Sequence, residues 1–212
     1  MAGGRILTIG LTGNAASGKT TVADRWRGSG IRVIDADRFG HAVLEEDRDA
    51  RAALVAAFGP GILAADGTID RSALGEAAFA TAEGTARLNA LVHPPLLARL
   101  EEALDTAERE GTDLVAIDAA LVFEFGLDGE MDIVVLVTAP RALREERLRR
   151  RRGMAPDRIA RLMAAQQPDI EKARASDYVI VNDGSPEELK TKADTILAAI
   201  RRKHHSREED RP

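Results

Sequence analysis

Short apolar runs recur along the chain and alternate with longer stretches of mixed polarity. The runs are nearly continuous in β-branched and aliphatic residues, a pattern typical of strands that are buried on both faces. The stretches between them are long enough for helical crossovers, so the alternation predicts an α/β fold with a parallel sheet. The five predicted strands are Ile6–Leu11, Ile31–Ile34, Leu114–Ile117, Ile133–Val137 and Tyr178–Val181.

The interval between the second and third predicted strands is much longer than the others and carries several helical patterns. We therefore predict a single domain over residues 1–203 with a helical insertion at about 39–110. Pro94-Pro95 and Pro156 are each expected to open a helix, because proline is well tolerated in the first turn. The short polar tail at residues 204–212 is expected to be disordered.

Residues 13–20 fit the pattern G-x-x-x-x-G-K-[ST], with an apolar strand before them and a helical pattern after them. Glycines allow backbone N–H groups to turn inward and form a nest for anions, and the following helix points its N-terminus at the same place. Lys19 would reach the β- and γ-phosphates, and the Thr20 hydroxyl would ligate Mg²⁺. A glycine-rich turn without a ligand is the alternative. The expected ATP contacts are Gly13, Asn14, Ala15, Ala16, Ser17, Gly18, Lys19, Thr20 and Thr21.

Three aspartates follow predicted strands at points where a parallel sheet binds its ligands. Asp35 and Asp37 come directly after the second strand, and Asp118 follows the third. The carboxyl ends of parallel strands share one crevice, and residues two apart share a direction if the chain stays extended. Asp37 is thus a candidate to accept the proton of an acceptor hydroxyl, and Asp118 to help hold Mg²⁺, directly or through water. A turn or cap role is the alternative for each.

Residues 141–161 form the most basic part of the chain. Arg144, Arg147 and Arg151 have i, i+3, i+7 spacing and share one helix face. In phosphoryl transfer such side chains close over the nucleotide and offset the charge that develops on the transferred group. We predict a lid over about 144–170. A solvated helix face is the alternative, since acidic residues interleave.

Composition narrows the range of partners. Lys and Arg number 30 against 35 Asp and Glu, so the net charge is −5, and aromatic residues make up 3%. These values argue against nucleic-acid and membrane partners. There is no Cys, which excludes disulfides and thiol catalysis. No apolar stretch approaches the length of a membrane span, so we expect a cytoplasmic protein, with a monomer as the default.

The ordered set of motifs resembles the dephospho-coenzyme A kinase family from about Ile6 to Ile200. Each motif alone is weak, but their order along the chain is specific. After the phosphate-loop pattern they are Val33-Ile34-Asp35-Ala36-Asp37, Asp66–Arg71 with Leu74 and Phe79, Leu88–Pro94, Asp118–Glu124, Arg147 to Arg151 with Arg161 and Gln166, and Asp177 with the turn Asn182-Asp183-Gly184.

The resemblance implies a P-loop kinase similar to nucleoside monophosphate kinases, with a five-stranded parallel sheet, a helical acceptor-binding insertion and an Arg-rich lid. It implies transfer of the ATP γ-phosphate to the 3′-hydroxyl of dephospho-CoA, the last step of coenzyme A biosynthesis, with Mg²⁺ as cofactor. Asp37 would be the catalytic carboxylate, beside Lys19 and Arg147. Arg147 and Arg151 would meet ATP phosphates, and Asn182 with Gly184 would lie near the adenine. The implied acceptor-site residues are Thr12, Asp37, Arg71, Phe79, His93, Leu121, Glu124 and Arg161.

The sequence also departs from the family pattern. The usual Pro-Leu-Leu is Ala120-Leu121-Val122, and a usual Gln is Arg144. For His93, packing at a helix start is an alternative to ligand binding. Two other functions therefore stay open: a P-loop kinase for another small-molecule or nucleotide hydroxyl, and a non-catalytic nucleotide-dependent switch. The N-K-x-D element that a GTPase would use for guanine is not found.

Overall fold

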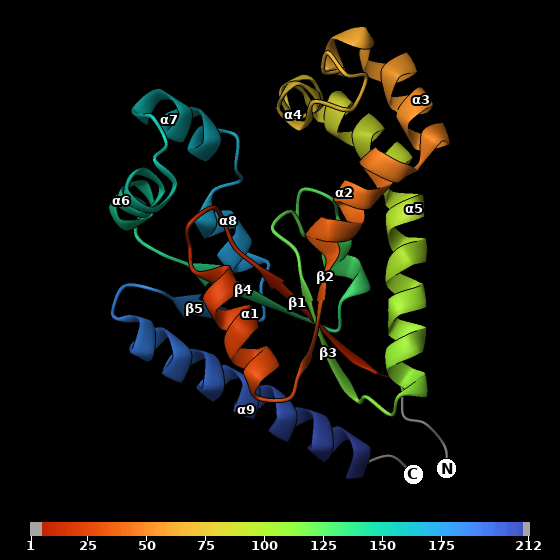
Figure 1. Cartoon of the computed structure of the whole chain (residues 1–212). Helices are drawn as coiled ribbons and strands as arrows, with labels where there is room; N and C mark the ends of the chain where they lie inside the picture. Colours follow the sequence, from red (N-terminus) through yellow and green to blue (C-terminus); the bar gives the residue numbers. More distant parts are fainter. Residues whose placement is uncertain (1–5, 210–212) are drawn as a thin grey trace. The chain divides into compact units, whose positions relative to one another are not determined.

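The five strands form one parallel sheet in the order β2-β3-β1-β4-β5, with β1 at its centre (Figure 1). The structure is a computed structural model that describes residues 6–209; for residues 151, 152 and 205–209 it describes the backbone alone. Every predicted strand is confirmed to within one residue at either end. The strands are β1 (Leu7–Thr12), β2 (Arg32–Asp35), β3 (Leu114–Asp118), β4 (Ile133–Thr138) and β5 (Tyr178–Val181).

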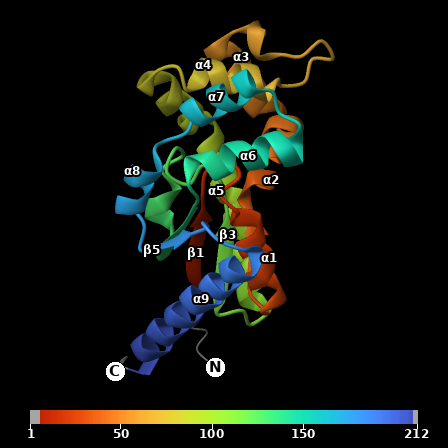
Figure 2. The same ribbon diagram turned by 90° about the vertical axis from the view of Figure 1, so that its left-hand side faces the viewer.

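Two helices, α1 (Lys19–Gly28) and α9 (Pro186–Glu209), lie side by side against the same face of the sheet (Figures 1 and 2). Trp26 of α1 is fully buried, and its indole N–H donates to the carbonyl of Ala193 at 3.0 Å. This apolar layer holds α1 firmly, so the N-terminus of α1 has a fixed place at the end of β1.

Three helices follow β4 along the chain: α6 (Arg141–Arg152), α7 (Pro156–Ala164) and α8 (Asp169–Arg174). Pro156 opens α7, as predicted. Leu148, Ile159 and Met163 pack together and join α6 to α7. The helical part of this region begins at Arg141, slightly before the lid predicted at about 144–170.

The chain divides into two compact units, Asp35–Thr106 and the remainder. The sequence predicted a helical insertion at about 39–110 within a single domain. In the structure the helical unit begins and ends about four residues earlier than that prediction. Asp47 and Asp70 cap two of its helices by accepting hydrogen bonds from backbone N–H groups of the first turn. Its elements are α2 (Ala36–Glu46), α3 (Arg48–Phe58), η1 (Pro60–Ile62), α4 (Arg71–Ala78) and most of α5 (Ala82–Arg109).

The predicted helix start at Pro94-Pro95 is wrong, because both prolines lie inside α5. A proline within a helix costs roughly 3 kcal/mol, since it removes a hydrogen bond and crowds the preceding turn. The helix nevertheless continues because one apolar face is buried along its length, and that packing outweighs local propensity. The buried positions are Leu88, Val92, Leu96 and Leu100.

The predicted disordered tail is also wrong for residues 204–209, because α9 continues to Glu209. Arg, Lys and Glu favour helix, and they extend a helix that is already anchored by buried Ile200. Residues 210–212 lie outside the described part of the chain.

Among the described residues, no helix combines the length and apolar character that crossing a membrane requires. The 3₁₀ segment η2 (Leu127–Glu130) lies between β3 and β4.

Candidate active site

The phosphate loop, residues 13–20, connects the end of β1 to the start of α1. A Cβ at Gly13 would collide with the carbonyl oxygen of Val137, so the loop lies directly against the end of β4. Gly18 has φ +107°, in the left-handed region that only glycine adopts easily, and α1 begins at the next residue. Ala16 also has a positive φ, of 61°. Small residues thus give the loop its tight curvature.

Lys19 and Asp118 meet at this end of the sheet. The Lys19 Nζ lies 2.6 Å from Asp118 Oδ1, and each side chain is 13% exposed. Asp118 is the last residue of β3 and is paired in register with Leu11 of β1. The hydroxyl-bearing Thr20 is the next residue of α1 and is exposed. The structure therefore gathers three sequence-predicted residues, Lys19, Thr20 and Asp118, at the carboxyl end of the central strands.

Asn182, which follows β5, supports one wall of the loop. It is buried; its amide Nδ2 donates to the Ser17 carbonyl at 2.7 Å. Arg147 of α6 donates to the Ala16 carbonyl at 3.2 Å and to Asn182 Oδ1 at 3.3 Å. Both residues were predicted to contact ATP. In this structure their side chains donate hydrogen bonds to backbone carbonyls of the loop and thereby hold its conformation.

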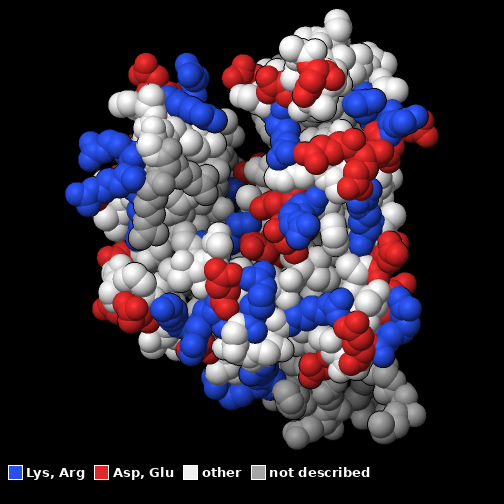
Figure 3. Space-filling view, in the orientation of Figure 1, with Lys and Arg blue, Asp and Glu red and all other residues white. Residues whose placement is uncertain are grey.

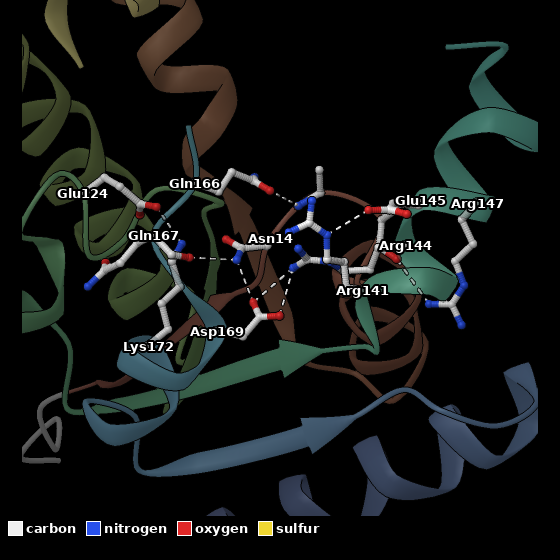
Figure 4. Close-up of polar contacts among 12 residues, drawn as sticks. Asn14, Glu124, Arg141, Arg144, Glu145, Arg147, Gln166, Gln167, Asp169 and Lys172 are labelled. Carbon is white, nitrogen blue, oxygen red and sulfur yellow. Dashed lines mark hydrogen bonds and ion pairs between the residues drawn. The ribbon is translucent and has the colours of Figure 1, made fainter. Parts of the chain in front are cut away.

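The segment from Gln166 to Asp169 contacts the first residues of the loop (Figure 4). Gln166 Oε1 accepts from the Ala15 backbone N–H at 3.2 Å. Asn14 Nδ2 donates to the Gln167 carbonyl at 3.0 Å and to Asp169 Oδ1 at 2.6 Å. Side chains from α6, α8 and the segment after β5 therefore fix the loop from outside.

Glu124 and Lys172 form a buried ion pair between the segment after β3 and α8. The Lys172 Nζ lies 2.7 Å from Glu124 Oε1, the Lys172 side chain is fully buried, and the Glu124 side chain is 11% exposed. Glu124 was predicted to line the acceptor site, and in the structure it pairs with this lysine. Of the other predicted acceptor residues, Leu121 lies three residues before Glu124 and is half-buried. Thr12, at the end of β1, is buried and donates through Oγ1 to the Ala120 carbonyl of the same segment at 3.2 Å.

Asp35 and Asp37 do not share a direction, because the chain does not stay extended after β2. Helix α2 begins at Ala36, and Asp35 becomes its N-cap, accepting from the Arg38 backbone N–H at 3.1 Å. Asp37 lies half-buried in the first turn of α2, in the unit Asp35–Thr106. Asp35 therefore serves as a helix cap.

Three further predicted acceptor residues belong to the same helical unit. Arg71 begins α4 and pairs with Glu45 at 2.6 Å, with both side chains largely exposed. Phe79 caps the C-terminus of α4 and is half-buried. His93 lies inside α5, also half-buried, so it does not sit at a helix start.

The outer surface of the lid region is strongly basic. Lys and Arg side chains gather at the edge of the molecule occupied by α6 and α7 (Figure 3). Arg161 is exposed on α7. Gly184 lies two residues after Asn182, and a Cβ at Gly184 would meet the carboxylate of Glu188. The side chain of Arg151, predicted to contact ATP, lies outside the described residues.

A parallel sheet with this loop at the end of its central strand defines a P-loop nucleotide-binding protein, and the arginine-rich helix α6 after β4 agrees with a kinase of that class. A family model described as dephospho-CoA kinase matches residues 7–188. The chain belongs to the dephospho-CoA kinase family.

Individual relatives agree with this assignment. A dephospho-CoA kinase from Corynebacterium glutamicum is 40% identical over 195 residues, 92% of this chain and 98% of that protein. One from Geobacillus kaustophilus is 41% identical over 191 residues, 90% and 95% of the two chains. A crystal structure from Thermus thermophilus has 32% identity and a TM-score of 0.76, covering 92% and 98%. The dephospho-CoA kinase from Campylobacter jejuni, at 21% identity and a TM-score of 0.54, shares the fold and covers 93% and 98%.

Sequence reasoning missed two residues that organise the site, Asp169 and Lys172. Their partners lie far away along the chain, so no local spacing reveals them. One signal was present: the chain has only five lysines beside 25 arginines, and Lys172 is one of them. Each lysine is therefore an exception to the chain's strong preference for arginine and a position to inspect, although the sequence does not show which of them is buried.

Proposed function

We propose that this protein transfers the γ-phosphate of ATP to the 3′-hydroxyl of dephospho-CoA. The family assignment supports the substrates, and the phosphate loop with Lys19 at its end supports the chemistry. The observation that carries the proposal is the Lys19–Asp118 pair: a cation is held at the mouth of an anion nest by a carboxylate that phosphate oxygens can replace.

In the proposed reaction the 3′-oxygen attacks the γ-phosphorus in line with the bond to ADP. The new O–P bond forms as the bond between the γ-phosphorus and the β,γ-bridging oxygen breaks, and ADP leaves with that electron pair. Asp37 accepts the proton of the 3′-hydroxyl. Support for Asp37 comes from its position directly after β2 and from the D-A-D motif of the family. Positioning and charge neutralisation supply the rest of the rate enhancement.

Lys19 leaves Asp118 and binds the β- and γ-phosphates, while N–H groups of residues 13–20 surround them. Arg147 is close enough to the loop, through Ala16, to offset charge on the transferred group. Arg151, Asn182 and Gly184 are proposed ATP contacts, and Thr12, Arg71, Phe79, His93, Leu121, Glu124 and Arg161 proposed acceptor contacts.

Mg²⁺ is the proposed metal. The oxygen donors present at the loop, the exposed Thr20 hydroxyl and the Asp118 carboxylate, are the hard ligands that Mg²⁺ prefers. Among the described residues no cluster of three or more His, Cys, Asp or Glu could hold a metal alone. Thr20 would therefore bind the ion together with ATP phosphates, and Asp118 would act through water. Bound there, the metal would neutralise phosphate charge.

A cytoplasmic location, a monomeric state and the lack of nucleic-acid or membrane partners stay predictions.

The test is an ADP-release assay with dephospho-CoA, run beside AMP, adenosine and shikimate as acceptors. We expect release only with dephospho-CoA, together with formation of coenzyme A by mass spectrometry. Release with another acceptor alone would favour the alternative kinase function. ATP binding with no transfer to any acceptor would favour a nucleotide-dependent switch.

The Asp37→Asn variant tests the proposed base. We expect turnover to fall by about 10²–10⁴-fold with ATP binding retained, because a general base contributes on that order. Asp49→Asn is the matched control, since Asp49 occupies the first turn of α3 as Asp37 occupies that of α2. Equal turnover in the two variants would remove Asp37 from the mechanism.

A further inference from the structure

Asp169 lies between the phosphate loop and helix α6 and binds both (Figure 4). Its Oδ1 accepts from Asn14 Nδ2 at 2.6 Å, and its two carboxylate oxygens lie 3.1 and 3.0 Å from Arg144 Nη1. Asn14 is the second residue of the phosphate loop and is almost fully buried. One carboxylate thus fixes the entrance of the loop to the helix that begins the lid.

This arrangement creates an electrostatic conflict. The loop is built to bind a polyanion, yet it is held by a side chain that is itself an anion. The Asp169 side chain is 28% exposed, so water screens its charge only in part. A bare carboxylate in this place would repel the phosphates that enter the loop.

Arg144 resolves the conflict because it carries the opposite charge at hydrogen-bond distance. Its side chain is only 7% exposed, although it belongs to an arginine-rich helix whose other described arginines are more exposed. Its guanidinium hydrogen-bonds Asp169 through Nη1, whereas within the described residues its Nε is buried without a hydrogen-bond partner. A guanidinium is suited to such a place because it stays charged when buried.

We propose that Arg144 is a positioning residue for ATP binding: it neutralises Asp169, so that a carboxylate can hold Asn14 and the phosphate loop without repelling the nucleotide. The inference rests on the proposed function, namely that the loop binds ATP. It assigns Arg144 no contact with the nucleotide or with the reacting atoms.

The proposal makes opposite predictions for the two partners. Arg144→Gln leaves the anion beside the loop, so the Kd for ATP rises about fivefold at 50 mM salt, the order expected when one unit charge in partly screened surroundings loses its counter-charge. Asp169→Asn removes the anion and keeps the cation, so ATP binds at least as tightly as in the wild type although the melting temperature falls. The double variant Arg144→Gln/Asp169→Asn returns the Kd to within about twofold of the wild type.

Isothermal titration calorimetry with ATP and Mg²⁺ measures these Kd values, and differential scanning calorimetry follows folding separately. Arg141→Gln is the matched control, because it removes the same charge from the same helix at an exposed position that pairs with Glu145. The effect of Arg144→Gln should shrink at 500 mM salt, because screening weakens charge repulsion. The kcat at saturating ATP should stay within about twofold, so the loss appears in KM.

Three results would overturn the proposal: Arg144→Gln binding ATP as the Arg141→Gln control does, the double variant binding as weakly as Arg144→Gln alone, or an effect independent of salt. The first would mean that Arg144 does not affect ATP binding, and the other two that it acts through shape. Failure of the proposed function gives a different outcome: a wild type that binds ATP but does not phosphorylate dephospho-CoA leaves these Kd comparisons valid, since they use ATP alone.

Discussion

Two lysine–carboxylate pairs flank the phosphate loop, and they have nearly the same length and opposite uses. The Lys19–Asp118 pair spans 2.6 Å, with both side chains 13% exposed, at the mouth of the loop. The Lys172–Glu124 pair, between α8 and the segment after β3, spans 2.7 Å with the lysine fully buried. Lys19 can exchange its carboxylate for phosphate, whereas the Lys172 side chain is fully buried and therefore shielded from anions in solution. Distance alone therefore does not distinguish a functional pair from a structural one; access to a competing anion does.

The largest expected effect is on the pair at the mouth of the loop. Lys19→Ala removes the charge that meets the β- and γ-phosphates, so kcat/KM should fall about 10³-fold, within the range typical of a lost electrostatic group in the transition state. Steady-state kinetics measures this, with circular dichroism to confirm folding. Lys190→Ala is the control, because Lys190 lies exposed on α9. A loss of less than tenfold would mean that the Lys19–Asp118 pair is structural after all.

The buried pair should respond in stability. Lys172→Met removes the cation that faces the largely buried Glu124 carboxylate, so the free energy of unfolding should fall by about 3–5 kcal/mol. Replacing both partners with apolar residues, in Lys172→Met/Glu124→Leu, should recover most of that loss. Urea denaturation measures both. If Lys172→Met lowers stability by less than about 1 kcal/mol, or if the double variant recovers nothing, this buried ion pair does not stabilise the fold in the way proposed.

The effect expected for Asn182 is intermediate between those for Lys19 and Lys172, because its side chain contacts the loop but carries no charge. Asn182→Leu keeps roughly the size of the side chain, adds no charge beside the loop and removes the donor to the Ser17 carbonyl. Loss of this bond should cost about 1–3 kcal/mol of stability and weaken ATP binding several-fold, since a freed loop must be ordered on binding. Thermal denaturation and calorimetric titration give the two values. Unchanged ATP affinity with lowered stability would confine Asn182 to a structural role.

The smallest expected effect concerns an exposed pair far from the loop. Arg25 donates two hydrogen bonds to Asp194, and this hydrogen bonding lowers the pKa of Asp194. A lowered folded-state pKa stabilises the protein above the unfolded value of about 3.9, and that stability is lost as pH falls through the folded pKa. Between pH 5 and pH 3 the wild type should therefore lose slightly more melting temperature than Asp194→Asn. Identical pH profiles would show that this pair contributes nothing measurable.

The sequence predicted most of the fold and the centre of the site, for reasons that are local. Buried parallel strands read as unbroken apolar runs, and the phosphate loop is one contiguous motif. What failed depended on tertiary packing. The buried face of α5 carries Pro94-Pro95 through a helix that local rules would begin there. The roles of Asp169 and Arg144 could not be read locally, because their bonds join distant segments.

The central claim is that phosphate held by residues 13–20 passes to dephospho-CoA. ATP labelled at the γ-phosphate tests this most directly, with wild type and Lys19→Ala incubated with dephospho-CoA and the products analysed by mass spectrometry. The account predicts one label per coenzyme A, on the 3′-phosphate, in equal amount to ADP, with almost none from Lys19→Ala. Unlabelled coenzyme A, label released only as inorganic phosphate, or equal transfer by Lys19→Ala would contradict it.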